Sequence, residues 1–125
     1  MNQEESKSVQ RLIQAGICNQ AEVDQSRRDA AAFSSPEFSR KIRRAGDVLG
    51  AIGEPNRIKI LLLLSKKEMC VCHLESALGM SQPTISHHLG VLERAELLHR
   101  RKKEKWVFYK LTDSPVTDLL RSLVL

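Results

Sequence analysis

The sequence predicts a mainly α-helical fold with a small β component, an α+β arrangement, and three observations point to it. Apolar residues recur at helical spacing from residue 36 to residue 95. Residues 97–111 then combine β-branched and aromatic side chains with a cationic centre, which is the pattern of a β-hairpin. Residues 115–125 return to helical spacing. We therefore expect helices to dominate, with one two-stranded hairpin before the last of them.

The bulk composition limits the class of protein. The chain has 125 residues, enough for one domain and one further element, and its 42% hydrophobic residues predict a core. A net charge of +5 favours an anionic partner, such as nucleic acid or a membrane surface. No apolar run is long enough to span a membrane, and the first ten residues lack a signal-peptide pattern. We therefore expect a cytoplasmic protein, with reduced thiols and no membrane partner.

The sequence patterns that predict helices are weak in the first part of the chain and strong in the second. Residues 1–33 are polar and mixed, and we expect a short amphipathic helix near residues 9–17, followed by either a helix or a mobile arm. Helix-start signals sharpen after residue 34. The expected organisation is an N-terminal extension or arm at residues 1–33 and a folded domain at residues 34–125.

Residues that favour helix N-termini and C-termini divide the part of the folded domain before the hairpin into four helices. Proline or serine near the start predicts helices at residues 36–52, 55–67 and 81–96. A third helix is expected from residue 70 to residue 78, with Gly79 as its C-terminal cap. Two helices joined by a short glycine-containing turn form the helix-turn-helix pattern.

The helix predicted at residues 81–96 has two unlike faces. Ile85, Leu89 and Leu92 recur at i, i+4 and i+7 and form an apolar stripe, and His88 lies near its edge and is expected to be structural. The other side, which we expect to include Gly90 and Val91, has no carboxylate before Glu93. Short hydrogen-bonding side chains suit the base edges of the DNA major groove. The candidate DNA contacts on this helix are Gln82, Thr84, Ser86 and His87.

The predicted hairpin carries a cationic tip around residues 102–105. A charge run is usually a solvated loop, but beside a helix-turn-helix it is expected to lie along the phosphate backbone. Such contacts set affinity and salt dependence rather than sequence choice. The candidate backbone contacts are Arg100, Arg101, Lys102, Lys103 and Lys105.

The last predicted helix is very apolar for a chain terminus, with six aliphatic residues between Val116 and Leu125. An isolated helix of this kind would expose an apolar surface, so we expect a two-fold partner to cover it. A homodimer would present two recognition helices ~34 Å apart and would bind an inverted repeat in double-stranded DNA.

Cysteine usage predicts a soft-ion site. The chain has three cysteines, and Cys70 and Cys72 lie two residues apart at the predicted start of a helix. In the middle of a helix their side chains would point about 200° apart, but at a helix start both can turn to one side. The helix N-terminus also favours thiolates, which bind soft ions rather than Mg²⁺ or Ca²⁺. His73 follows directly, and we expect it to be exposed or capping rather than a ligand.

The helix order, the segment SQPTISHHLGVLERAELL, the basic hairpin and the Cys-Val-Cys motif resemble the ArsR/SmtB family over residues 36–125. The resemblance implies a homodimeric winged helix-turn-helix repressor that releases its operator when a metal or metalloid ion binds, and not an enzyme. It implies that Cys70 and Cys72 bind the ion, and that Cys18 can add a third thiolate from the N-terminal extension. Three thiolates fit As(III) or Sb(III), with Cd(II) or Pb(II) next, and no organic cofactor is implied.

The sequence departs from the family pattern in two places. The family commonly has Ala-Gly-Leu where this chain has Ala-Glu-Leu at residues 95–97. The hairpin tip is Lys-Glu-Lys at residues 103–105 rather than a turn with glycine, which predicts a looser tip.

Three other functions remain open from the residues alone. A thiol–disulfide switch of the same fold would pair Cys18 with Cys70 or Cys72 and respond to peroxide. A nonspecific nucleoid protein would explain the charge but not the paired cysteines. An enzyme is disfavoured because the chain lacks a Cys-x-x-Cys motif in a βαβ pattern and a glycine-rich phosphate loop.

Overall fold

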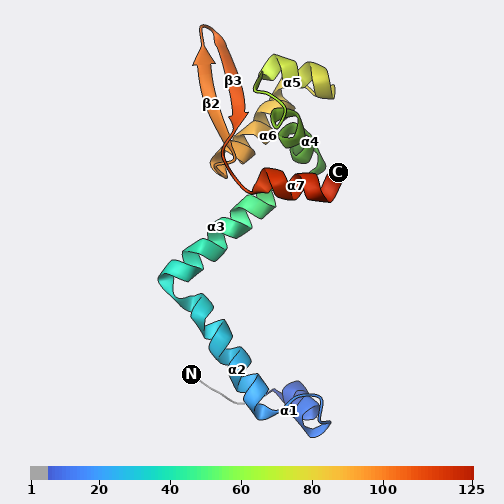
Figure 1. The fold of residues 1–125 in the computed structure, drawn as a ribbon, viewed down its shortest axis with the longest axis vertical. Coiled ribbons are helices and arrows are strands. Elements are labelled where there is room, and N and C mark those ends of the chain that lie inside the picture. The colour runs from blue at the N-terminus through green and yellow to red at the C-terminus, as the bar shows by residue number, and fades with distance from the viewer. Residues whose placement is uncertain (1–5) are drawn as a thin grey trace. The chain divides into compact units, whose positions relative to one another are not determined.

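The structure is a computed structural model, and it describes residues 6–125. The chain divides into two compact units, residues 1–42 and residues 43–125, and the division falls inside α3. None of the helices in the described part is long and apolar enough to cross a membrane. The elements, drawn in Figure 1, are α1 (Lys7–Gln14), α2 (Gln20–Ala31), η1 (Ala32–Ser34), α3 (Pro36–Ile52), α4 (Pro55–Leu64), β1 (Met69–Cys70), α5 (Val71–Leu78), α6 (Gln82–Arg94), β2 (Leu98–Lys103), β3 (Trp106–Leu111) and α7 (Val116–Val124).

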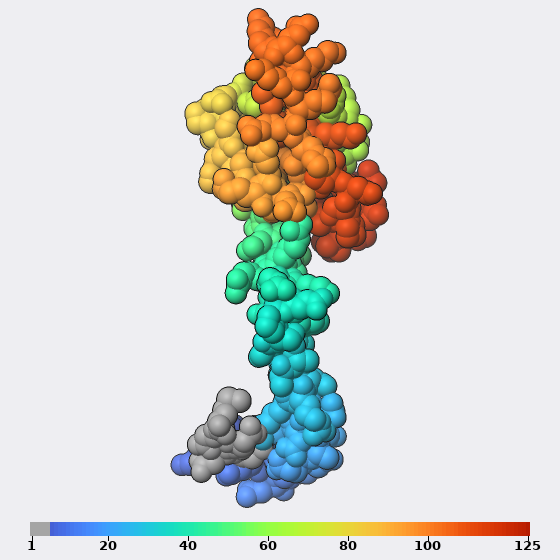
Figure 2. Space-filling model, turned by 90° about the vertical axis from the view of Figure 1, so that its left-hand side faces the viewer, coloured from blue at the N-terminus to red at the C-terminus, as the bar shows by residue number. Residues whose placement is uncertain are grey.

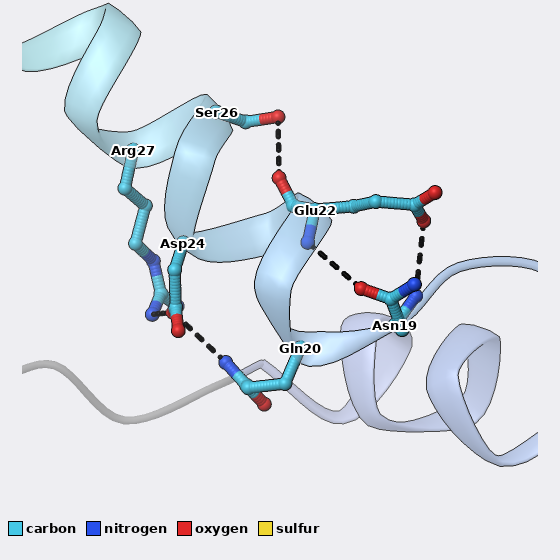
Figure 3. Close-up of polar contacts among 6 residues, drawn as sticks. All are labelled: Asn19, Gln20, Glu22, Asp24, Ser26 and Arg27. Atoms are coloured by element: carbon cyan, nitrogen blue, oxygen red, sulfur yellow. Dashed lines mark hydrogen bonds and ion pairs between the residues drawn. The ribbon is translucent and has the colours of Figure 1, made fainter.

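Local hydrogen bonds at the helix starts organise the first unit. The Ser6 hydroxyl caps α1, and Gly16 takes a positive φ of 73° where the chain leaves that helix. At the start of α2 the Asn19 side chain accepts from the Glu22 backbone N–H at 2.9 Å, and the Glu22 carboxylate accepts from the Asn19 N–H at 3.0 Å (Figure 3). No residue of α1 or α2 is buried, so these capping bonds define both helices. The segment predicted as a helix or an arm is a helix.

The core of the second unit lies between α4, α5 and α6. Five side chains are almost completely buried, and each contributes about 1.5–3 kcal/mol of hydrophobic stabilisation. Three of them are the apolar stripe predicted for α6, which is confirmed. The five residues are Ile60, Leu74, Ile85, Leu89 and Leu92.

The predicted helix boundaries in this unit are mostly confirmed. The Glu54 carboxylate caps α4 by accepting from the Arg57 backbone N–H at 2.9 Å, and Ser81 caps α6. Gly79 ends α5 in the left-handed region, with φ of 66°. This turn directs α5 into α6, and the two helices pack against each other as the predicted helix-turn-helix.

The sheet contains one strand more than the sequence predicted. The hairpin of β2 and β3 is the predicted two-stranded wing, but β1 adds a third strand in the order β1-β3-β2. Met69 lies opposite Tyr109, and Cys70 lies opposite Phe108. Because Cys70 is extended to make this pairing, with φ of −84° and ψ of 168°, helix α5 begins one residue later than predicted.

Glu96, where the sequence departs from Ala-Gly-Leu, keeps a backbone conformation that glycine usually adopts. Its φ is 61°, its N–H donates to the Glu93 carbonyl at 2.9 Å, and the Leu97 N–H donates to the Leu92 carbonyl at 3.0 Å. These bonds form a Schellman motif at the end of α6. The side chain also has a partner, since Arg44 of α3 donates to its carboxylate at 2.5 Å, and this hydrogen bond lowers the pKa of Glu96.

The second positive φ lies at the tip of the wing. Glu104 has φ of 57° in the two-residue loop between Lys103 and Trp106, which are paired across the hairpin. A left-handed conformation costs a residue with a side chain about 1–2 kcal/mol. Unlike Glu96, Glu104 makes no ion pair with any other residue between positions 6 and 125.

We expect Glu104→Gly to stabilise the protein. Relief of the left-handed strain, less the greater freedom of glycine in the unfolded chain, predicts a gain of about 0.5–1 kcal/mol. Urea unfolding at one fixed protein concentration measures it. Glu104→Ala, which keeps the strain, is the control and should give no gain; equal stability of the glycine and alanine variants would contradict the prediction.

Candidate functional site

The four predicted DNA-contacting residues of α6 lie together at its N-terminal half. Gln82, Thr84 and His87 are exposed, and Ser86 is half-buried. The Gln82 amide donates to the Ser86 hydroxyl at 2.7 Å, and the Thr84 hydroxyl lies 2.9 Å from the Ser81 hydroxyl. The structure therefore presents a continuous polar surface with no carboxylate. Its contact with DNA stays a prediction.

The exposed face of α6 in the structure includes fewer residues than the sequence predicted. Val91, which was expected to point away from the apolar stripe, is partly buried against the core, so that prediction was wrong. The reason is that α6 packs against α4, α5 and β2, which together cover more than one side of the helix. Helical spacing shows which residues share a face but not how many sides are covered.

His88 takes the structural position that the sequence predicted. Its side chain is only 8% exposed, and its Nδ1 lies 3.2 Å from Nη1 of Arg57. A guanidinium can only donate, so Nδ1 of His88 is the acceptor in this contact. Arg57 Nε also donates to the Ala51 carbonyl at 2.5 Å. This network, which the sequence did not reveal, connects α6 to α4 and to the end of α3.

Glu54 completes the network around His88. Its carboxylate lies 3.8 Å from Nδ1 of His88. Partial burial acts to raise the pKa of Glu54, but the backbone N–H groups of Arg57 and Asn56 stabilise the carboxylate and leave the pKa below its ordinary value. The negative charge therefore stays beside Arg57, where it offsets the guanidinium charge.

The five predicted cations of the wing fall into two groups, of which the first is ion-paired. Arg100 Nε lies 3.0 Å from the Glu93 carboxylate. Arg101 forms two hydrogen bonds with the Glu68 carboxylate and lies over the Phe108 ring, 5.6 Å from its centroid. The hydrogen bond from Arg101 lowers the pKa of Glu68, so the carboxylate is charged at neutral pH and this pair persists.

The second group is at the tip. Lys102, Lys103 and Lys105 are exposed, and none of them has an ion-pair partner between positions 6 and 125. Lys105 lies over the Trp106 ring at 5.2 Å from its centroid. Figure 2 shows the tip, in orange, projecting beyond the rest of the second unit. The tip lysines are therefore better placed than Arg100 and Arg101 to meet an external anion.

The paired cysteines line one apolar cleft. Cys70 ends β1, Cys72 lies in the first turn of α5, and both side chains border a cleft of about 420 Å³. Its other lining residues are His73, Trp106 and Phe108. The pairing of Cys70 with Phe108 brings the thiols beside the aromatic residues of the wing. Binding of an ion by these thiols stays a prediction.

The remaining predicted ligand lies in the first unit. Cys18 follows α1, precedes α2 and is half-buried. All three cysteines are free thiols. Within residues 6–125 the structure groups no three His, Cys, Asp or Glu side chains at metal-binding distance. The participation of Cys18 also stays a prediction.

Sequence reasoning did not identify the aromatic wall of the cleft. Trp106 and Phe108 are two residues apart on one strand, which places both on the same face. That spacing could have been seen in the sequence. What could not be seen is the pairing of β1 with β3, because two residues carry too little pattern to predict a strand.

Comparison with known proteins gives one matching family. Residues 54–100, from the cap of α4 to β2, match the family described as bacterial regulatory protein, arsR family. This segment includes the helix-turn-helix and both cysteines of the cleft.

Two curated relatives and one solved structure show how far the similarity extends. The chain is 39% identical over 82 residues to the HTH-type transcriptional regulator MJ1325 of Methanocaldococcus jannaschii, covering 65% of this chain and 92% of that protein. It is 48% identical over 62 residues to the arsenical resistance operon repressor of Escherichia coli, covering 49% of this chain and about half, 53%, of that repressor. Its fold matches HlyU from Vibrio cholerae with a TM-score of 0.62 at 34% identity, covering 66% of this chain and 90% of that one.

Proposed function

This chain belongs to the ArsR family of bacterial regulatory proteins, whose members are DNA-binding transcriptional regulators and not enzymes, and on that premise we propose that it is a homodimeric, metal- or metalloid-responsive repressor. In its ion-free state the dimer binds an operator with inverted-repeat symmetry. A soft ion captured by cysteine thiolates releases it. A repressor acts where the DNA is, so we place it in the cytoplasm.

The observation that carries the DNA-binding role is the combination of α6 and the wing. The exposed part of α6 offers hydrogen-bonding side chains without a carboxylate, and the tip of the wing offers unpaired lysines. In the proposed complex, Gln82, Thr84, Ser86 and His87 meet base edges and nearby phosphates. Lys102, Lys103 and Lys105 contact the phosphate backbone, and Arg100 and Arg101 do so only if they leave Glu93 and Glu68.

An exposed apolar surface on α7 supports the homodimer. Leu119 and Val124 are about half exposed, Leu123 is 73% exposed, and Leu125 is 92% exposed. Aliphatic side chains grouped at this exposure are typical of protein interfaces. We propose that a second copy of the chain covers them.

The donor set supports a soft effector. Cys70 and Cys72 border the same cleft, and thiolates prefer soft ions. We propose As(III) or Sb(III), with Cys18 as a third thiolate, and place Cd(II) and Pb(II) next. The similarity to the Escherichia coli arsenical resistance operon repressor favours arsenic.

The position of the thiols suggests how ion binding reaches the DNA-contacting elements. Cys70 pairs with Phe108 of the wing, and Cys72 opens α5, which packs against α6. An ion held by both thiols would fix the junction of β1 and α5, which contacts both the wing and the recognition helix. Linkage then requires ion and operator to weaken each other's binding by the same factor, typically about 1–3 kcal/mol.

We expect Ser86→Ala combined with His87→Ala to weaken operator binding at least about tenfold, because each lost base contact removes about 1–3 kcal/mol of discrimination. The operator can be selected from random DNA with the purified protein, and gel-shift titration measures the affinity. Ser8→Ala, an exposed serine on α1, is the control. Undiminished binding by a folded double variant would exclude this face.

We expect Lys102→Gln with Lys103→Gln to flatten the dependence of log affinity on log salt. Two lysines on each of two protomers account for up to four phosphate contacts, so the slope should fall in magnitude by up to about 3.6. Arg100→Gln with Arg101→Gln should change the slope less, since both arginines are ion-paired within the protein. Equal slopes for the wild type and the lysine variant would show that the wing tip does not contact DNA.

We expect Cys70→Ser with Cys72→Ser to keep operator binding but lose the response to the effector. Gel shifts of wild type and variant, each challenged with As(III), Cd(II), Zn(II) and peroxide, measure this. Release by As(III) that requires both cysteines supports the proposal. Release by peroxide alone would identify a thiol–disulfide switch, and binding abolished by an equal mass of random DNA would identify a nonspecific DNA-binding protein.

A further inference from the structure

A second pocket, on the wing, holds one carboxylate among basic side chains. It has a volume of about 590 Å³, and we call it the wing pocket. His99 lies opposite Lys110 across the hairpin, so both side chains project from the same face of the sheet. Arg101, two residues further along β2, shares that face. The residues that line the wing pocket are Glu68, His99, Arg100, Arg101 and Lys110.

Glu68 occupies the wing pocket in the way that an anionic ligand would. Its carboxylate accepts two hydrogen bonds from Arg101, one from Nε at 3.3 Å and one from Nη2. The hydrogen bond from Arg101 lowers the pKa of Glu68, and the positive charges of Lys110 and Lys103 lower it further. A guanidinium binds a phosphate through the same pair of parallel hydrogen bonds. Glu68 therefore holds Arg101 in a geometry that also suits a phosphate.

The other donors of the wing pocket on this face are not engaged. His99 and Lys110 are exposed, and neither forms an ion pair or a side-chain hydrogen bond with any residue between positions 6 and 125. An ammonium group and an imidazole N–H can each donate to a phosphate oxygen. The wing pocket thus has donors for an anion beyond the one carboxylate that it contains.

We propose that the wing pocket binds one phosphate of the DNA backbone, and that Glu68 competes with this phosphate for Arg101. The residues that contact the phosphate are His99, Arg101 and Lys110. This inference rests on the proposed function and adds a DNA-contacting site to the one at the tip of the wing. The side chains of Glu68 and Arg101 are 31% and 54% exposed, and exposed ion pairs are weak, so a DNA phosphate can displace the carboxylate.

This competition affects the salt dependence of DNA binding. A cation that contacts a phosphate releases a condensed counterion and contributes about 0.9 to the slope of log affinity against log salt. When Arg101 exchanges Glu68 for a phosphate, the freed carboxylate attracts a cation from solution, so the contribution of Arg101 is reduced. Without the carboxylate the full contribution returns, and it amounts to about 1.8 for the two protomers of a dimer.

Glu68→Gln in the full-length protein tests the inference, because it keeps the shape of the side chain and removes its charge. Gel-shift titration should show binding about threefold tighter, both to the operator and to random-sequence DNA, since the weak ion pair no longer competes. The slope should become steeper by up to about 1.8. In the Arg101→Gln background the same change should lose most of this gain.

Two further variants make the test independent of Glu68. Lys110→Gln should weaken binding to both DNAs and flatten the slope by up to about 1.8, because one phosphate contact is lost on each protomer. Glu37→Gln is the matched control, since it removes a carboxylate that is ion-paired with Lys41 in the first unit. It should change neither the affinity nor the slope. Circular dichroism and urea unfolding of each variant measure whether the fold is kept.

Three results would overturn the inference: unchanged or weaker binding by a folded Glu68→Gln variant, an equal gain from Glu37→Gln, or a gain confined to the operator. An unchanged slope in Lys110→Gln would overturn it as well. If Ser86→Ala with His87→Ala still weakens operator binding in that case, the proposed function survives. If the wild-type protein binds no DNA, both fail.

Discussion

Complete burial of the apolar stripe of α6 is the constraint on which the surface proposed to contact DNA depends. Ile85, Leu89 and Leu92 are no more than 1% exposed, packed among side chains of α4 and α5. Turning the helix by one residue would rotate it by about 100° and expose them, at a cost of about 1.5–3 kcal/mol for each. The orientation of α6 is therefore fixed by its buried side, and the direction in which the exposed polar side faces follows from it.

A polar network adds direction to this packing. Hydrophobic burial is not directional, whereas the contact between His88 and Arg57 and the hydrogen bond from Arg57 to the Ala51 carbonyl require defined positions. Just beyond the C-terminal end of α6, the link between Glu96 and Arg44 of α3 does the same. The middle of α6 and its C-terminal end are thereby both connected to the part of α3 that lies in the second unit, through Ala51 and Arg44.

The short strand β1 has consequences out of proportion to its length. Met69 and Cys70 pair with β3, and this pairing places Cys70 opposite Phe108. Helix α5 begins at the next residue, and Cys72 lies in its first turn. The thiols thus lie where the wing and the helix-turn-helix meet. An effector bound at this junction, as proposed above, would touch both elements proposed to contact DNA, whereas one bound at the surface of either element would touch only that element.

Several features followed from the sequence alone, because they depend on neighbours in the chain. The cap at Ser81, the helix start at Pro55, the turn at Gly79 and the apolar stripe of α6 are set by residues within about four positions of one another. The hairpin, the structural position of His88 and the family resemblance were also predicted from the sequence. Local chemistry was therefore sufficient for the order of the helices and the hairpin after residue 35, for the mainly α winged helix-turn-helix fold and for the candidate residues.

Only the tertiary structure decided which of those candidates are available and what surrounds them. Arg101 and Glu68 are 33 residues apart, and so the ion pair that occupies this arginine has no local signal. The burial of Val91 depends on how many elements cover α6, and the aromatic wall of the thiol cleft depends on a pairing between strands far apart in sequence. These contacts join segments that are far apart in the sequence, and the packing of the whole core determines which of them meet. Residue patterns within one segment therefore cannot predict these contacts.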